Sequence, residues 1–326
     1  MRKVLLLIAA LSLPAATQAQ FNWEFGGSMG AANYLGDIGG NEETRRDFVY
    51  DMKIQKTRWS FGGFARYRLF PGLHLKGSMG IHRIEGDDAL STNRARNFRN
   101  LSFRNNLFEV ATTAEWSFWR TANTMGRPGI RGSRKKIDMR AFVFGGIGFV
   151  LSNPKTEYNG TVYKLRPLQT EGVAYSPFAF SVPLGLGFNY TMNRHHRIGV
   201  ELTWRWVNTD YLDDISTNYV DPAKLPNETS RQLSNRTDDL LAQMAAEGKT
   251  PTKEDISYAA SYGYNLYNEQ SQKLNKRGDS NNRDNFLSLS VTYGYVIKGK
   301  NKFYKSRYKS LSQRRKVIKR KTKAKF

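Results

Sequence analysis

The most constraining feature of the sequence is an alternation of apolar with polar or small residues, repeated over segments of about ten residues. Along 73–82, for example, the odd positions are mostly aliphatic, whereas the even positions include His74, Lys76 and His82. Successive side chains of a strand point to opposite faces, so such a segment has one apolar and one polar face. The pattern predicts eight strands, at 21–31, 59–69, 73–82, 108–118, 141–151, 181–190, 198–206 and 287–295.

The polar faces of these strands favour a closed membrane barrel over a soluble sandwich. A sandwich core would bury the histidines and the lysine of 73–82, whereas a wet barrel lumen accepts them. Glu109 and Glu115 share the polar face of 108–118, so we expect ion pairs in the lumen. Aromatic residues make up 13% of the chain and glycines number 28, as lipid-facing strands require. The predicted fold class is all-β: an eight-stranded antiparallel transmembrane β-barrel of outer-membrane type.

Two residues and one segment depart from the simple alternation. Phe64 interrupts the polar face of its strand, and the segment 141–151 is apolar on both faces. Pro183 lies within 181–190, and proline cannot donate a hydrogen bond to a strand ladder. We therefore expect a bulge or a strand start at Pro183.

The connections between the predicted strands alternate in length. The segments 70–72 and 193–196 are short, and both fall on the side of the membrane that also holds the two chain ends. The third connection on that side, 120–138, is longer and basic. The connections 36–56, 84–105, 152–178 and 208–285 are long. Outer-membrane barrels have short periplasmic turns and longer external loops, which predicts that both termini are periplasmic.

The start of the chain has the order of a secretory signal. Met1-Arg2-Lys3 precedes an apolar run over 4–13 and a small-residue stretch that ends at Ala19. The run of about ten residues is too short for a transmembrane helix, which needs about 20. We expect a signal peptide at 1–19, a barrel over 20–297 and a tail over 298–326. The chain has no cysteine, which excludes disulfides and lipoprotein acylation.

The longest connection, 208–285, contains a helix signal. Thr237-Asp238-Asp239 is a polar start, and Leu240, Leu241 and Met244 follow at helical spacing. A second helical stretch is expected after Thr252. A loop of this length is usually functional or disordered, so it either caps the lumen or has no fixed structure.

No pattern predicts a catalytic, cofactor or metal site. The glycines of 145–148 lie within a predicted strand, whereas a phosphate-binding loop would precede a helix. His195-His196 forms a turn pair without a third ligand nearby in sequence. Ser78, His82 and Glu85 are the one conceivable hydrolase cluster, and lumenal polarity explains them better. The sequence therefore predicts a protein that is not an enzyme.

The segment that follows the last predicted strand is strongly basic. It carries no acidic residue and holds most of the formal net charge of +23. Like-charge blocks are usually solvated and disordered, but clustered cations also attract acidic surfaces. Aromatic residues within this block favour a docking arm for an anionic periplasmic partner, and a periplasmic location argues against nucleic acid. The predicted partner-binding residues are Lys298, Lys300, Lys302, Phe303, Tyr304, Lys305, Arg307, Tyr308, Lys309, Arg314, Arg315, Lys316, Lys319 and Arg320.

The segment 23–38, WEFGGSMGAANYLGDI, resembles the opening of the PorG family of outer-membrane proteins of Bacteroidetes. The arrangement of strands over 21–297 is consistent with this resemblance. The resemblance implies an outer-membrane component of the type IX secretion system, a non-enzymatic anchor for a periplasmic ring of a lipoprotein and its partner. It implies contacts with outer-membrane lipid and no cofactor.

Two other functions remain open. A general OmpA-like structural or adhesion barrel would act through its external loops. A lipid-modifying barrel enzyme would depend on His82. Neither function accounts for the basic tail.

Overall fold

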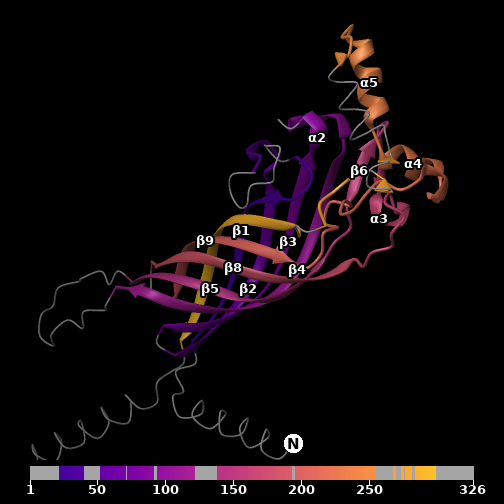
Figure 1. The fold of residues 1–326 in the computed structure, drawn as a ribbon. Helices are drawn as coiled ribbons and strands as arrows, with labels where there is room; N and C mark the ends of the chain where they lie inside the picture. Colours follow the sequence, from indigo (N-terminus) through magenta and orange to yellow (C-terminus); the bar gives the residue numbers. More distant parts are fainter. Residues whose placement is uncertain are drawn as a thin grey trace, which may run out of the picture.

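The computed structural model describes residues 22–39, 52–70, 72–91, 94–121, 138–192, 195–253, 267–268, 273–274, 276–280 and 283–298. Within these ranges the molecule is an elongated barrel of long strands with a cap of helices and short strands at one end (Figure 1). No helix of the described residues is long and apolar enough to cross a membrane.

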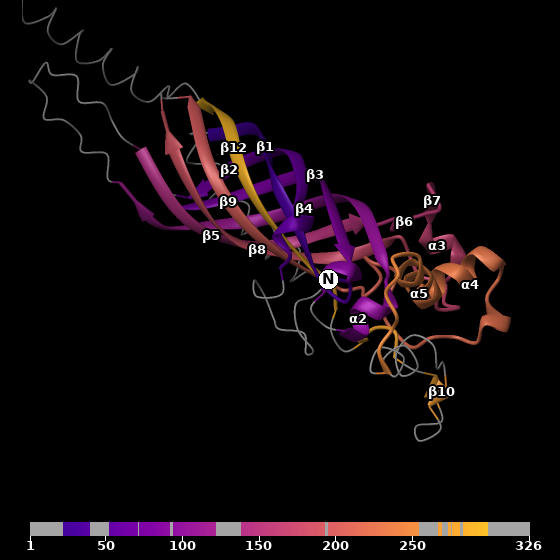
Figure 2. The same ribbon diagram turned by 90° about the horizontal axis from the view of Figure 1, so that it is seen from above.

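The eight predicted strands are all present, and every neighbouring pair is antiparallel. Around the barrel the order is β3-β2-β1-β12-β9-β8-β5-β4, and pairing of β3 with β4 closes the wall (Figure 2). Closure leaves no free edge in the barrel wall. The strands are β1 (Asn22–Leu35), β2 (Arg58–Phe70), β3 (Leu73–Asp87), β4 (Ser102–Arg120), β5 (Asp138–Leu151), β8 (Phe178–Thr191), β9 (His196–Val207) and β12 (Asn285–Lys298).

The outer wall carries an apolar belt, as a lipid-facing surface requires. Along β4 the belt runs from Phe108 to Phe118, whose side chains are 43% and 55% exposed. Ten residues of a strand tilted by about 40° span about 25 Å, the height of the apolar band in outer-membrane barrels. Aromatic side chains mark both rims. They include Trp23, Phe25, Trp116, Trp119, Tyr293 and Tyr295 at one rim, and Trp59, Phe61, Phe149 and Phe178 at the other.

The lumen contains phenylalanines paired with glycines on neighbouring strands. Phe142 of β5 lies opposite Gly187 of β8, and an added Cβ on this glycine would lie 2.2 Å from the ring. Phe144 opposite Gly185 repeats the arrangement. The aromatic ring therefore fills the space of a missing side chain and covers the glycine backbone. This pairing explains why 141–151 is apolar on both faces: its second apolar face fills the lumen.

Pro183 causes neither a bulge nor a strand start, so this prediction was wrong. Strand β8 begins at Phe178, and Pro183 pairs in register with Arg205 of β9. On the β5 side the pairing stops between Gly145↔Leu184 and Gly148↔Ser181 and resumes without a change of register. The strand therefore accommodates the missing N–H as a local gap in one ladder.

The described parts of the four long connections build the cap. Strands β3 and β4 extend past the predicted ends, so both ends of the predicted loop 84–105 are strand, with η4 (Asp88–Leu90) and α2 (Arg94–Arg99) between them. The predicted helix at 237–245 is confirmed as α5, and the expected helix after Thr252 lies almost entirely outside the described residues. The other elements are η3 (Ile54–Lys56), β6 (Lys155–Tyr158), β7 (Thr161–Lys164), α3 (Leu165–Leu168), η5 (Pro222–Lys224), α4 (Glu228–Ser234), α5 (Thr237–Ala246), β10 (Tyr267–Asn268) and β11 (Lys273–Leu274).

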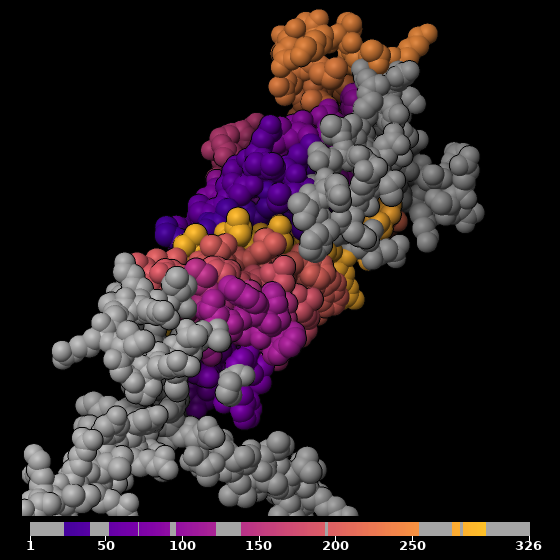
Figure 3. All heavy atoms as spheres, turned by 90° about the vertical axis from the view of Figure 1, so that its left-hand side faces the viewer, coloured from indigo at the N-terminus to yellow at the C-terminus, as the bar shows by residue number. Residues whose placement is uncertain are grey.

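The cap has its own hydrophobic core, continuous with the end of the barrel. Ile215 and Leu233 from the connection between β9 and β12 pack in one buried cluster with Ile38, Leu101 and other residues of the shorter connections and strand ends. In the space-filling view α5 (orange) stands at the far end of the molecule, beyond the barrel wall (Figure 3). The described part of 208–285 therefore folds onto the barrel end, which favours the capping alternative over disorder.

Candidate functional site

The centre of the lumen is a network of ion pairs organised by Arg66 of β2. Its guanidinium lies 2.6 Å from Glu24, 2.8 Å from Glu115 and 2.9 Å from Glu201. The three carboxylates come from β1, β4 and β9, so one side chain connects the wall of the barrel across its interior. Arg66 is only 1% exposed. A buried charge of this kind is tolerated because its donors are matched with acceptors.

Three further cations complete this network. Lys76 binds Glu201, Arg197 binds Glu24, and Arg140 lies 2.7 Å from Glu115. Arg140 also donates to Nδ1 of His74 at 2.6 Å, so that nitrogen must be unprotonated. The predicted lumenal ion pairing is thus confirmed, although Lys76 pairs with Glu201 of β9 and not with the two carboxylates of β4 on which the prediction was based.

Rings and cations alternate in the same region. The Arg140 guanidinium lies 4.3 Å from the ring centroid of Phe142, and Arg66 lies 4.8 Å from that of Phe64. The Lys76 ammonium lies 5.0 Å from the Phe64 centroid. Cation–π contacts stabilise desolvated cations. Phe64, which interrupted the alternation in the sequence, therefore has a lumenal role.

A second network lies closer to the cap. Arg205 of β9 lies 2.6 Å from Glu109, and it donates to the Ser288 hydroxyl at 2.7 Å. Between the two networks is a cavity of about 50 Å³, lined by residues that include Phe64, Lys76, Glu109 and Arg205. A water needs roughly 10–15 Å³ of such space, so the cavity has room for a few waters.

The predicted cluster of Ser78, His82 and Glu85 is not brought together. His82 points into the lumen, whereas Glu85 lies on the outer face of β3, where it pairs with Arg58 and Arg83. The Ser78 hydroxyl donates to the Ala111 carbonyl at 3.5 Å. This hydrolase hypothesis fails because Glu85 is an odd number of residues from Ser78 and His82, so it lies on the opposite face of the strand.

His82 instead connects a different serine and a different carboxylate. Its Nδ1 lies 2.7 Å from the Ser60 hydroxyl, and its Nε2 lies 3.3 Å from Glu109. Ser60 lies directly opposite His82 on the neighbouring strand, a relation that depends on register and is invisible in the sequence. All three side chains are buried, and the adjoining cavity has no room for an acyl chain. The arrangement therefore places three hydrogen-bonded polar groups in the lumen.

The glycines of 145–148 and the pair His195-His196, which were considered as binding sites from the sequence, contact the barrel wall itself. The glycines of 145–148 lie within β5, where Gly146 is so close to the Thr112 carbonyl that an added Cβ would overlap it. His195 Nδ1 lies 2.8 Å from the Val296 carbonyl, and His196 Nδ1 lies 2.7 Å from the Tyr293 hydroxyl. Among the described residues, no group of three or more histidine or acidic side chains could hold a metal ion.

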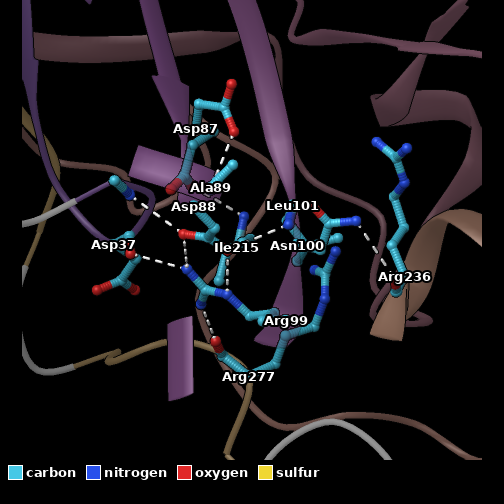
Figure 4. Close-up of polar contacts among 12 residues, drawn as sticks. Asp37, Asp87, Asp88, Ala89, Arg99, Asn100, Leu101, Ile215, Arg236 and Arg277 are labelled. Atoms are coloured by element: carbon cyan, nitrogen blue, oxygen red, sulfur yellow. Dashed lines mark hydrogen bonds and ion pairs between the residues drawn. The ribbon is translucent and has the colours of Figure 1, made fainter. Parts of the chain in front are cut away.

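In the cap, Arg99 joins three of the long connections (Figure 4). Its guanidinium binds Asp88 at 2.7 and 2.9 Å and donates to the carbonyls of Asp37 and Arg277. Burial lowers the pKa of Arg99, but the attraction of the Asp88 carboxylate outweighs this effect, so the pKa lies above its usual value. One buried arginine therefore fixes the first, second and fourth long connections to each other.

Arg277 forms the second such contact. It donates to Glu171 at 3.0 Å, to the Asp214 carbonyl at 2.9 Å and to the Ser234 carbonyl at 3.1 Å. The Asp214 carboxylate accepts hydrogen bonds from Thr170 and Tyr175, each at 2.5 Å. Burial raises the pKa of Asp214 to about 6, although Arg277 opposes the shift. The third long connection is thereby attached to the fourth.

A third contact requires a shared proton. The Tyr34 hydroxyl lies 2.7 Å from Asp213 and 2.5 Å from Asp284, but it has only one proton to donate. One of the two carboxyls must therefore be protonated and donate to the Tyr34 oxygen. Burial and mutual repulsion of the carboxylates raise the pKa of Asp213, and burial together with the nearby Asp210 raises that of Asp284.

The predicted partner-binding segment begins where the barrel ends. Lys298 is the last residue of β12 and pairs with Asn22, the first residue of β1. The other thirteen residues of the set lie outside the described residues, as do 1–19 and most of the basic connection 120–138. Arg120 and Asp138, at the ends of that connection, lie 3.5 Å apart as an ion pair.

Comparison with known proteins identifies the barrel. A family model described as the outer membrane protein beta-barrel domain matches residues 4–221, more than half of the chain. No curated protein matches the chain.

Solved structures with a similar fold include two barrels of Pseudomonas aeruginosa. OprG is similar at 10% identity over 86% of this chain and 97% of its own, with a TM-score of 0.35. The N-terminal barrel domain of OprF is similar at 12% identity over 86% of this chain and 100% of its own, with a TM-score of 0.32. Ail of Yersinia pestis is similar at 9% identity over 84% of this chain and 98% of its own, with a TM-score of 0.30. On the family match, the chain belongs to the outer membrane protein β-barrel domain family and is an outer-membrane protein.

Proposed function

We propose that the protein is a non-enzymatic anchor of the type IX secretion system, holding a periplasmic ring of a lipoprotein and its partner at the outer membrane. In this proposal the cap is external, and the short turns and both chain ends are periplasmic. The specific assignment follows the resemblance of 23–38 to the PorG family. The barrel would serve as the membrane anchor, and the tail 298–326 would make the contact.

The observation that carries this proposal is the position of Lys298. It forms the last pair of β12 with β1, at the end of the barrel opposite the cap, which is the side of the short turns. The filled lumen supports an anchor over a pore, since its charges are paired and its cavity of about 50 Å³ has room for only a few waters. A cationic tail beyond the membrane would attract an acidic partner surface.

The proposal can be tested with a variant whose tail has lost its positive charges. Replacing the lysines and arginines of 300–325 with glutamine should leave insertion and heat-modifiable migration intact while reducing recovery of ring components with the tagged barrel by about tenfold. A control for basic residues elsewhere replaces Lys224, Lys249 and Lys253 of the cap with glutamine. Unchanged recovery from the tail variant would contradict the proposal.

The folded cap favours one second candidate, a structural or adhesion barrel that acts through its long connections. Its buried arginines and shared proton hold four connections in one arrangement, and a preorganised surface binds at lower entropic cost. In that case the cap variant, and not the tail variant, would lose its partner.

A further inference from the structure

A row of cations crosses the outer wall at the cap end. Lys164 of β7 lies opposite Lys155 of β6, and Lys155 lies opposite Arg104 of β4. Directly opposite residues share a face, with Cβ atoms about 5 Å apart. The face is the outer one, because the neighbouring Phe103 and Thr156 are buried toward the core. The register therefore places three like charges side by side on the surface of the barrel.

The one carboxylate in this row is already engaged. Glu85 of β3 lies opposite Arg104, but its two oxygens lie 2.6 Å from Arg58 and 2.8 Å from Arg83. Within the described part of the chain, Arg104, Lys155 and Lys164 form no ion pair. Like charges directly opposite each other destabilise a sheet, so the row has an electrostatic cost that a bound anion would relieve.

The row continues directly from the apolar belt on the same wall. The last outward pair of the belt is Ile81 with Phe108, both 43% exposed. The next outward pair is Arg83 with Asn106, about 7 Å further along the strands, and the row follows after the same interval. A ligand that fits this surface has acyl chains against the belt and a negative charge at the row. A free phosphate or an acidic protein would leave the belt unused.

We propose that this row, together with Arg83, binds the phosphate groups of a phosphorylated glycolipid of the lipid A type, which forms the outer leaflet of the membrane. Arginine and lysine are suited to phosphate, and their long stems pack along apolar surface while the charge reaches the headgroup. The assignment to this leaflet rests on the proposed orientation of the cap. The binding chemistry does not depend on the tail or on a periplasmic ring.

The experiment compares the full chain in detergent micelles with bis-phosphorylated lipid A, its dephosphorylated form and phosphatidylglycerol, by native mass spectrometry. Wild type should prefer bis-phosphorylated lipid A over the dephosphorylated form by roughly tenfold or more, given the usual attraction of clustered cations for anionic headgroups. The variant Arg104→Gln/Lys155→Gln/Lys164→Gln should lose this preference. The control Lys224→Gln/Lys249→Gln/Lys253→Gln, which removes the same charge from the same end, should keep it.

Thermal unfolding without lipid separates binding from folding. The row variant should be at least as stable as wild type, because like charges have been removed, and only wild type should be stabilised by added lipid A. Lys164→Gln alone, at an exposed position, provides a milder variant with a smaller loss. An unchanged preference in the row variant would overturn the proposal, and stronger binding of phosphatidylglycerol would reassign the row to a phospholipid. Neither result would affect the tail experiment.

Discussion

The lumen and the cap both bury many charged groups, but they balance them differently. In the lumen, three carboxylates of one network meet four cations, and each carboxylate is held by at least two of them. In the cap, carboxyls outnumber their cations, and Tyr34 connects two acids that share a proton. From this difference we expect a barrel interior built from paired ions to be insensitive to mild pH change, and a cap whose stability depends on protonation.

The largest effect is expected in the lumen. Arg66→Gln leaves three buried carboxylates without their central partner, and breaking such a buried pair costs about 3–5 kcal/mol of unfolding free energy. Urea unfolding followed by tryptophan fluorescence measures the change. Arg83→Gln, which removes an arginine from an ion pair on the outer wall, is the matched control and should cost less than about 1 kcal/mol. Equal losses in the two variants would mean that the lumenal network is not the stabilising element.

The cap should respond to pH where the lumen does not. The pKa of Asp214 is raised to about 6 in the folded cap, so the folded cap retains a proton that an unfolded chain releases near pH 4. The stability of the cap is therefore highest at acidic pH and falls as pH rises from about 4 through 6. A shift of about two units corresponds to at most about 3 kcal/mol. Asp213 and Asp284 shift in the same direction and add to the trend.

Hydrogen exchange of the full chain at pH 4.5 and pH 7, corrected for intrinsic rates, measures this response. Segments around 208–219 should be better protected at the lower pH, while the strands that carry the lumenal network should not change. Asp214→Asn should reduce the difference. Greater protection of the cap at pH 7 would refute the sign of this prediction.

A smaller change in stability is expected from substitutions at the contact where Tyr34, Asp213 and Asp284 share a proton. Asp284→Asn should be neutral or stabilising at pH 7, because the amide oxygen can still accept from Leu212 N–H while its NH₂ donates to Tyr34. Tyr34→Phe removes the bridging hydroxyl and leaves buried carboxylates facing each other, at a cost of about 1–3 kcal/mol. Local exchange rates in the cap provide the comparison. Destabilisation by Asp284→Asn as large as that by Tyr34→Phe would rule out the shared proton.

The strands could be predicted from the sequence because lipid and lumen impose opposite polarity on alternate residues. The same reasoning explains where the predicted strands ended too early. Beyond Ile81, β3 continues with Arg83 and Glu85 on its outer face, so the alternation disappears where the strand leaves the belt, although the pairing with β4 continues. Sequence shows the end of the apolar belt and not the end of the strand.

The contacts of the site could not be predicted in the same way. That the lumen would hold ion pairs followed from inward Glu109 and Glu115, but which cation meets which acid depends on strand register and barrel curvature. The pair of Ser60 with His82 and the three-way contact of Arg66 are examples. The cap contacts join residues up to 250 positions apart, such as Tyr34 and Asp284, and no local pattern reports them.

The measurement that tests the proposed anchor most directly is lysine cross-linking of the membrane-embedded protein in intact cells, with mass spectrometry of the linked peptides. We expect cross-links from lysines of 298–325 to periplasmic ring subunits and few from Lys224, Lys249 and Lys253 in the cap. A silent tail, with protein cross-links confined to the cap lysines, would contradict the anchor and assign the function to the cap.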